Sequence, residues 1–190
     1  MHIQSILDLK KFPIIEFDNF ILREIDPEQD FEQYYDYMSH DMVSEFIADN
    51  IRVNSADKAL RDLMYWHSVF HEGASIYWCI ASPIDNKMIG TVGFNHISVT
   101  TKTASISYDL NVEFWGKGIM RKSIEAICQF IHDTFGIKKV EATVVKQNLK
   151  SIKALEKTGF MFYSMLYSHE VIEGKPHDSF VYIKNLDKKP

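Results

Sequence analysis

Hydrophobic and polar positions recur with two different periods along the chain, and each period predicts one type of element. Within residues 119–135, Met120, Ile124, Ile127 and Ile131 are spaced by four, three and four, which predicts a helix that packs on a sheet. Residues 138–145 are rich in β-branched side chains and therefore predict a strand. A strand at 103–110 precedes the helix, so the order implies a parallel pair joined by a right-handed crossover.

Shorter patterns predict the remaining elements. Asp26-Pro27 is typical of a helix start, with Asp as the N-cap, Pro at the first position and Gln29 at the third. A second helix is expected to start at Asn54 or Ser55 and to end at Gly73. Further strands are expected at 20–25, 75–82, 88–95, 161–167 and 179–184. Together these elements predict an α/β (α+β) chain with a mixed sheet of about seven strands flanked by helices, in one domain covering 1–190.

The loop before the long helix reads Glu-Phe-Trp-Gly-Lys-Gly-Ile-Met-Arg over residues 113–121. Gly116 and Gly118 leave the backbone without Cβ atoms, and the helix N-terminus directs unpaired N–H groups into the same loop. Lys117, Arg121 and Lys122 add positive charge. The loop therefore predicts a pyrophosphate cradle, with an ordinary tight connection as the alternative.

Composition and charge narrow the class of protein. With 190 residues, 46% hydrophobic, one domain with a sizeable core is expected. Cys79 and Cys128 have no paired-cysteine motif, which predicts reduced thiols and a cytoplasmic location. No run of residues is long and apolar enough for a membrane span, and no basic stripe with interleaved aromatics indicates nucleic-acid binding.

Charge differs between the two halves of the chain. Residues 1–100 contain seven Lys and Arg against 16 Asp and Glu, and residues 101–190 contain 14 against 10. A basic half around the loop and an acidic half elsewhere suit an anionic carrier and a cationic acceptor, although surface charge that serves solubility alone is the alternative. His67 and His71 are spaced four apart, but without an apparent third ligand the sequence predicts no metal site.

The glycine loop and the segments that follow it resemble a known family. Trp-Gly-Lys-Gly-Ile-Met (115–120) is followed about thirty residues later by Asn-x-x-Ser (148–151) and then by Glu-Lys-x-Gly-Phe (156–160). This combination resembles the GNAT superfamily of acetyl-CoA-dependent N-acetyltransferases, and within it the RimJ/RimL branch, which acetylates protein N-termini. The resemblance is densest over residues 88–184.

The resemblance implies how acetyl-CoA would bind. In that family the two parallel strands splay apart, and the pantetheine arm lies in the gap like an extra strand. The backbone around Tyr108 and Leu110 would pair with the arm, and the Leu110 N–H would polarise the thioester carbonyl. Asn148 and Ser151 would lie along the arm near the sulfur. The residues that would hold the pyrophosphate are Trp115, Gly116, Lys117, Gly118, Ile119, Met120 and Arg121.

The chemistry also needs a neutral amine and a stabilised thiolate. Glu141, Asp109 and His96 are candidate proton acceptors, and a water chain is a further alternative. Alternation along the strand places Asp109 on the face opposite Tyr108 and Leu110. Glu141 could instead form a structural ion pair with Lys139 or Arg121.

The sequence departs from the family at two positions. Many relatives carry Tyr seven residues after the Asn to protonate the leaving thiolate, whereas this chain has Leu155. Ser151 is the nearest substitute, and its expected role is a hydrogen bond to the sulfur. Glu113 stands where many relatives have Gln or Arg, but the loop can still bind through backbone N–H groups.

These observations predict an N-acetyltransferase that works by direct transfer in a ternary complex, with Ser151, Glu141 and Leu110 as candidate catalytic residues. The preferred acceptor is a peptide or protein N-terminal amine, because its ordinary pKa near ~8 requires no strong base. The alternatives are a small-molecule amine, such as a polyamine or an aminoglycoside, and a non-catalytic acyl-CoA-binding module. The oligomeric state is left open between monomer and homodimer.

Overall fold

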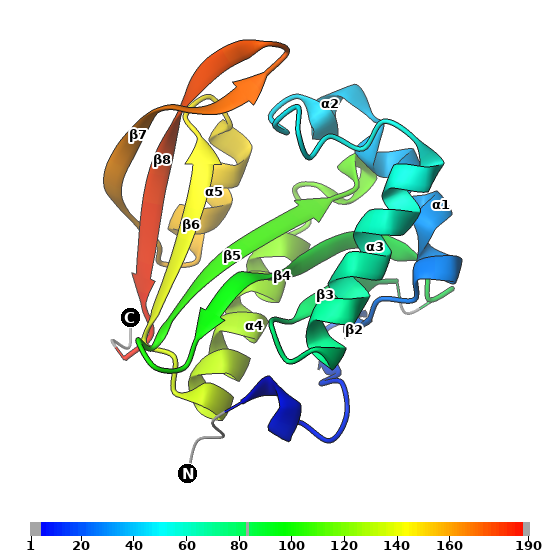
Figure 1. Cartoon of the computed structure of the whole chain (residues 1–190), viewed down its shortest axis with the longest axis vertical. Helices are drawn as coiled ribbons and strands as arrows, with labels where there is room; N and C mark the ends of the chain where they lie inside the picture. The colour runs from blue at the N-terminus through cyan, green and yellow to red at the C-terminus, as the bar shows by residue number, and fades with distance from the viewer. Residues whose placement is uncertain (1–4, 83, 188–190) are drawn as a thin grey trace.

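One eight-stranded sheet runs through the computed structural model of the chain, which describes residues 5–82 and 84–187 (Figure 1). The strand order is β1-β2-β3-β4-β5-β6-β8-β7, and only β5 and β6 are parallel neighbours. The strands are Ile15–Phe17 (β1), Phe20–Glu24 (β2), Tyr77–Ala81 (β3), Met88–Ser98 (β4), Thr103–Leu110 (β5), Lys139–Val145 (β6), Met161–Ile172 (β7) and Lys175–Asn185 (β8). The mixed α/β class is confirmed. The sequence missed β1, because three residues are too few to show a period.

Over residues 5–82 and 84–187, five α-helices and two 3₁₀ turns accompany the strands. They are Ile6–Asp8 (η1), Pro27–Met38 (α1), Asp41–Ser44 (α2), Ala56–His71 (α3), Val112–Phe114 (η2), Ile119–Phe135 (α4) and Leu149–Lys157 (α5). The expected caps of Asp26 and Ser55 are confirmed, as is the left-handed stop at Gly136. In a capping box the third helical residue, here Gln29, would accept a hydrogen bond from the N-cap N–H. Here the Asp26 N–H donates instead to the Asp30 carboxylate, at 2.9 Å.

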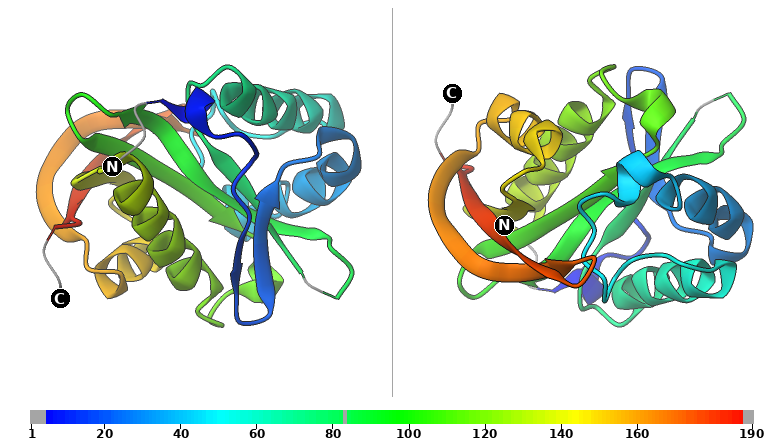
Figure 2. Two further views of the ribbon diagram at one scale, coloured as in Figure 1. Left: turned by 90° about the horizontal axis from the view of Figure 1, so that it is seen from below. Right: turned by 90° about the horizontal axis from the view of Figure 1, so that it is seen from above.

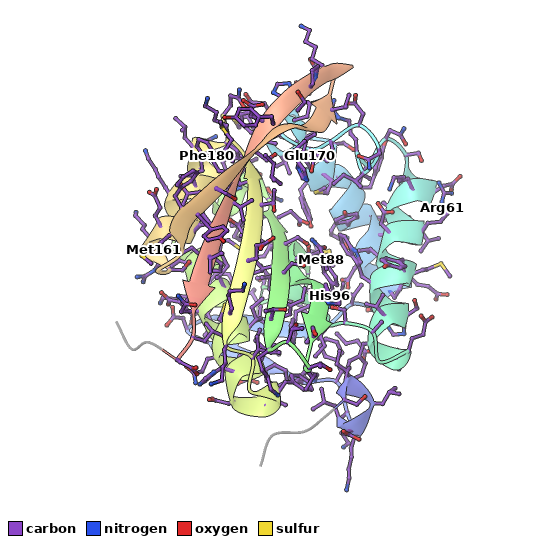
Figure 3. All side chains as sticks on the ribbon, turned by 60° about the vertical axis from the view of Figure 1, so that its left-hand side comes forward. Arg61, Met88, His96, Met161, Glu170 and Phe180 are labelled. Carbon is purple, nitrogen blue, oxygen red and sulfur yellow. The ribbon has the colours of Figure 1, made fainter. Side chains whose placement is uncertain are left out.

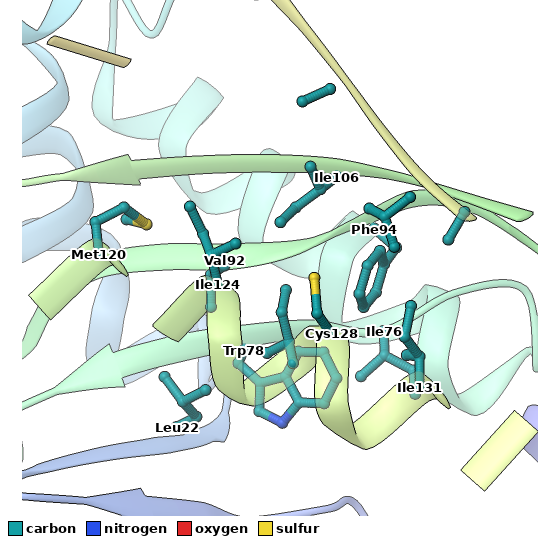
Figure 4. Packing of buried hydrophobic residues seen from close by; sticks show 14 of the residues in the cluster. Leu22, Ile76, Trp78, Val92, Phe94, Ile106, Met120, Ile124, Cys128 and Ile131 are labelled. Carbon is teal, nitrogen blue, oxygen red and sulfur yellow. The ribbon is translucent and has the colours of Figure 1, made fainter. Parts of the chain in front are cut away.

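Helices cover both faces of the sheet, and each face buries its own core (Figure 2). The strand β3 is buried along its whole length, so its alternate side chains divide between the cores. Cys79 and Ala81 pack with α1 and α3, whereas Trp78 and Ile80 pack with the cluster that includes Ile124 of α4 (Figure 4). Cys79 and Cys128 are both buried free thiols. No helix in the described part of the chain is both long and apolar enough to cross a membrane.

The parallel pair separates halfway along its length, as the resemblance implied. Thr103–Ile106 of β5 pair with Lys139–Ala142 of β6, and the register ends there. From Ser107 onward β5 pairs only with β4, and from Thr143 onward β6 pairs only with β8. We call the four paired positions the seam; beyond the seam the sheet is open between the two strands.

A contact on the far side of this opening joins two segments that are distant in sequence. The backbone N–H groups of Glu173 and Gly174, at the turn between β7 and β8, donate to the Asp49 carboxylate at 2.8 and 2.9 Å. The Asp49 N–H in turn donates to the Val171 carbonyl at 2.9 Å. We call this contact the Asp49 clip. It connects the β7–β8 hairpin to the segment between α2 and α3, which lie side by side in Figure 1.

Candidate active site

The opening between β5 and β6 is part of one large cleft, with a volume of about 1940 Å³. Its walls come from both halves of the sheet, from the N-termini of α4 and α5, and from the segments joined by the Asp49 clip. The cleft brings together the residues that were predicted to bind acetyl-CoA and the three predicted catalytic residues. These are Tyr108, Leu110, Trp115, Gly116, Lys117, Gly118, Ile119, Met120, Arg121, Glu141, Asn148 and Ser151. Their individual roles stay predictions.

The glycine loop has the geometry that an anion cradle requires. Gly116 and Gly118 have φ values of +75° and +78°, which L side chains rarely adopt, and a Cβ at either position would meet no atom within 4 Å. Gly118 is the N-cap of α4, and no side chain caps the helix there. Ile119 and Met120 are buried in the core, so they can offer a ligand only their backbone N–H groups. The open space and uncapped N–H groups fit a pyrophosphate.

Positive charge gathers on this side of the cleft, although not from every predicted residue. Lys122 forms an ion pair with Asp18 of the β1–β2 turn, so its expected place beside the cradle is wrong. Lys117 stays near the loop, with Nζ 4.9 Å above the Phe114 ring, and the exposed Arg121 lines the cleft. Asp18 is about a hundred residues away in sequence, so the pattern around the loop could not reveal this pair.

The helix α5 adds lysines that the sequence analysis did not include. Lys150, Lys153 and Lys157 all line the cleft, and their spacing of three and four places them on one face of the helix. The Lys150 ammonium lies 4.0 Å from the centre of the Trp115 ring, which is cation–π distance. This periodicity was visible in the sequence and could have identified these lysines.

Trp115 fixes the loop to the end of β5. Its indole N–H donates to the Leu110 carbonyl at 2.8 Å, and the ring packs partly against the main core. The indole is therefore held by the end of β5 and by the core. This hydrogen bond fixes the end of β5, at Leu110, relative to the glycine loop.

The N-terminus of α5 meets β5 through a pair of hydroxyl groups. The Asn148 side chain caps α5 by accepting from the Ser151 N–H at 3.1 Å. The Ser151 hydroxyl lies 2.7 Å from the Tyr108 hydroxyl, and burial raises the pKa of this tyrosine. Leu155, at the position of the missing tyrosine, is fully buried in the core. The sequence predicts a backbone role for Tyr108 and gives no sign of its side-chain contact, because only the fold brings its hydroxyl to Ser151.

Asp109 lies on the other face of β5, as alternation predicted. Its carboxylate accepts from the Tyr37 hydroxyl at 2.5 Å, from the Thr91 N–H at 3.1 Å and from the Thr91 hydroxyl at 2.7 Å. Burial raises the pKa of Asp109 to about 6, although these hydrogen bonds oppose the shift. The carboxylate therefore ties α1 to β4 and β5 beneath the cleft.

The other two candidate proton acceptors differ in their access to the cleft. Glu141 is half-buried and lines the cleft, and within the residues that the structure describes it forms no ion pair with Lys139 or Arg121. His96 is exposed and does not line the cleft. Of the two, only Glu141 is placed to accept a proton from a group in the cleft.

Aromatic side chains form the wall opposite the α5 lysines. Trp66 of α3 stacks on Tyr77 of β3 with ring centres 5.0 Å apart, and Tyr34 meets the Trp66 edge. On the hairpin side, His169 and Glu170 also line the cleft, and His169 Nδ1 lies 3.2 Å from Glu170 Oε1. Figure 3 labels Glu170 on the hairpin. We call this part of the cleft, between α3 and the hairpin, the acceptor side.

Comparisons with known proteins agree with this arrangement. A family model described as an acetyltransferase (GNAT) domain matches residues 19–161. The uncharacterized N-acetyltransferase YoaA of Bacillus subtilis is 28% identical over 171 residues, covering 90% of this chain and 96% of that protein. The [ribosomal protein uS5]-alanine N-acetyltransferase of Escherichia coli is 23% identical over 111 residues, covering 57% of each chain.

Solved structures have the same fold. An acetyl-CoA and AMP complex of the microcin C7 self-immunity acetyltransferase MccE has a TM-score of 0.79 at 24% identity, covering 90% of this chain and 94% of that one. The ribosomal L7/L12 α-N-protein acetyltransferase RimL in complex with coenzyme A has a TM-score of 0.82 at 20% identity. Its match covers 93% of this chain and 100% of that chain.

Proposed function

Since this chain belongs to the GNAT acetyltransferase family, we propose that its acceptor is the free N-terminal amine of a peptide or protein. The chain is an acyltransferase, an N-acetyltransferase that uses acetyl-CoA as donor. This enzyme class rules against the non-catalytic acyl-CoA-binding module that the sequence alone left open. The identity of the amine is the part that we propose.

The Asp49 clip is the observation that carries this choice. By joining the hairpin to the α2–α3 segment, it bridges the acceptor side of the cleft. A bridged opening leaves less room around the acceptor, so it admits a single extended chain end more readily than a lysine side chain that has backbone on both sides of it. The clip therefore favours a terminal amine over an internal lysine side chain.

The charges on the acceptor side support the same choice. Five carboxylates line the cleft: Glu45, Asp62, Asp109, Glu141 and Glu170. Asp62 is paired with Lys58 at 2.7 Å, Glu170 lies beside His169, and Asp109 is enclosed by hydrogen bonds. A polycation such as spermidine would require several unpaired carboxylates close together. Of the five carboxylates named above, only Glu45 and Glu141 are left without such a partner among the residues that the structure describes.

Different residues of the chain would bind the cofactor, accept the proton and stabilise the leaving thiolate. Bound acetyl-CoA would supply an acetyl group activated as a thioester. The N–H groups at the start of α4 and the lysines of α5 would hold its phosphates, and the unpaired edge of β5 beyond Ile106 would hold its arm. We assign Glu141 to accept the proton of the amine, directly or through water, and the Ser151 hydroxyl to donate a hydrogen bond to the departing sulfur.

The acceptor is tested with a panel of amines assayed by thiol release from acetyl-CoA. The panel contains one lysine-containing peptide with a free N-terminus, the same peptide with a blocked N-terminus, spermidine and an aminoglycoside. We expect turnover with the free peptide to exceed turnover with each of the others. Equal rates on the free and blocked peptides, or a preference for spermidine, would overturn the proposed acceptor while leaving the enzyme class unchanged.

A further inference from the structure

The outer side of α3 contains a cluster of three groups that can bind a metal, away from the cleft. Glu24 Oε1, at the end of β2, lies 2.7 Å from His71 Nε2 and 3.4 Å from His67 Nδ1. One ligand atom from each residue lies within 4.8 Å of the others. The sequence alone predicted no metal here for lack of a third ligand, and Glu24 could not be recognised because it precedes His71 by 47 residues.

We propose that Glu24, His67 and His71 form a binding site for a Zn²⁺-class divalent transition-metal ion. Two imidazole nitrogens and one carboxylate oxygen are a ligand set that zinc commonly takes, with water in the fourth position. In a tetrahedral site, zinc–ligand bonds of about 2.1 Å place neighbouring ligand atoms roughly 3.4 Å apart. The three side chains are therefore close to the required spacing and need only small rotations of their terminal groups.

The local environment supports binding of moderate strength. The three side chains are between 35% and 55% exposed, so an ion and its water can reach them. His67 Nδ1 also lies 3.0 Å from the Ile25 carbonyl, and this hydrogen bond is given up if Nδ1 binds the metal. Lys10 and Lys11 border the same hollow as Glu24 and His71, and their charge opposes a cation. We therefore expect micromolar affinity.

A metal in this position would join β2 to α3 without entering the cleft. None of its three ligands is among the residues that line the cleft. The ion would stabilise the packing of α3, whose Trp66 stacks on Tyr77 at the acceptor side. We expect bound zinc to raise thermal stability, since an ion that binds only the folded state stabilises it by mass action.

Calorimetric titration of the tag-free, metal-stripped protein with zinc chloride tests the site. We expect one ion per chain, and at least about tenfold weaker binding in Glu24→Gln and His71→Gln. His96→Gln, at an exposed histidine outside the cluster, is the matched control and should bind as the wild type does. Differential scanning fluorimetry should show a zinc-dependent rise in Tm that the two ligand variants lose.

Three results would overturn the proposal. They are the absence of saturable binding, wild-type affinity in both ligand variants, and an equal loss in His96→Gln, which would indicate scattered surface histidines. Acetyl transfer by the metal-stripped variants shows that they are folded. The test of the metal site does not depend on the proposed acceptor, because it measures ion binding and Tm and not acetyl transfer.

Discussion

Tyr108 brings a phenol to the N-terminus of α5, where the sequence around Asn148 offers no tyrosine. Its hydroxyl lies 2.7 Å from the Ser151 hydroxyl, whereas Leu155 fills a core position. Burial raises the pKa of Tyr108, so the phenol keeps its proton near neutral pH. A protonated phenol can donate to the Ser151 oxygen, which leaves the serine proton free to point at the sulfur. We therefore expect Tyr108 to act as a positioning residue, through Ser151.

A double-mutant cycle tests this pair. We expect Tyr108→Phe and Ser151→Ala each to lower kcat by roughly 10-fold with little change in the acetyl-CoA KM. Ser151→Ala removes the hydrogen bond to the developing thiolate, and Tyr108→Phe removes the bond that orients the serine hydroxyl. The double variant should lose no more than either single variant. Tyr163→Phe, at an exposed tyrosine of β7, is the control. Fully additive losses would show that the two hydroxyls act separately.

Asp109 gives the stability of the protein a defined dependence on pH. Its folded pKa of about 6 is above the ordinary value near ~3.9, so the folded state binds the proton more tightly than the unfolded chain. The contribution of this group to stability is therefore complete below about pH 4 and is lost as pH rises through about 6.

Asp109→Asn should remove this dependence. Relative to the variant, the wild type should lose on the order of 2 kcal/mol of unfolding free energy between about pH 4 and 7. Urea unfolding followed by circular dichroism at several pH values measures the difference. Parallel curves for the two proteins would show that Asp109 is already ionised at pH 4 in the folded state.

At the scale of elements, the loop and α4 act together, because the loop places the uncapped helix end at the cleft. Gly118→Asp and Gly118→Asn form a matched pair, since both side chains tolerate positive φ and both can cap a helix. Only Asp adds negative charge where a pyrophosphate would sit. We expect Gly118→Asp to bind acetyl-CoA at least about tenfold more weakly than Gly118→Asn by calorimetry. Equal affinities would argue against the cradle.

The elements that the sequence predicted well are those whose pattern is long enough to be periodic. The stripe of α4, the caps at Asp26 and Ser55, and the glycine stop after α4 all depend on neighbours within a few residues. The strand β1 and the helix α2 have three and four residues, which is too short for either period. The β7–β8 hairpin is also longer than its apolar runs, because its outer positions are exposed.

The sequence predicted those parts of the site that lie within a few residues of one another. It could not predict the parts that depend on contacts between distant segments. The glycine loop and Asn148 could be assigned from spacing alone. The pairing of Ser151 with Tyr108, the ion pair of Lys122 with Asp18 and the Asp49 clip each join segments separated by at least 43 residues. Such contacts follow from strand order and register, which a single sequence does not specify.

The whole molecule consists of two antiparallel parts of one sheet, joined at the seam and again at the Asp49 clip. Backbone hydrogen bonds lower the pKa of Asp49, so its carboxylate stays charged, and the clip is lost only as pH falls through that lowered pKa. The clip should therefore be intact throughout the neutral range. Removing it would free the hairpin from the α2–α3 segment.

Asp49→Ala should widen the range of acceptors. We expect acetylation of an internal lysine, relative to a free N-terminus, to increase roughly tenfold, because the acceptor side is no longer bridged. Asp85→Ala, at an exposed aspartate of the β3–β4 turn, is the control and should keep the wild-type ratio. An unchanged ratio in Asp49→Ala would show that the Asp49 clip does not determine which amine is acetylated. Peptides with free and blocked N-termini provide the measurement.

The shortness of the seam determines how the protein comes apart under denaturant. Four residue pairs hold β5 to β6, whereas β4 with β5 and β6 with β8 are paired over most of their lengths. One core cluster packs against both parts of the sheet, so we expect the short seam and the cleft to open before that core is lost. In a urea titration, acetyl transfer should disappear at a lower concentration than helical circular dichroism does. Amide hydrogens of Thr143–Val145 should then still exchange slowly through their pairing with β8, after the catalytic cleft has been lost.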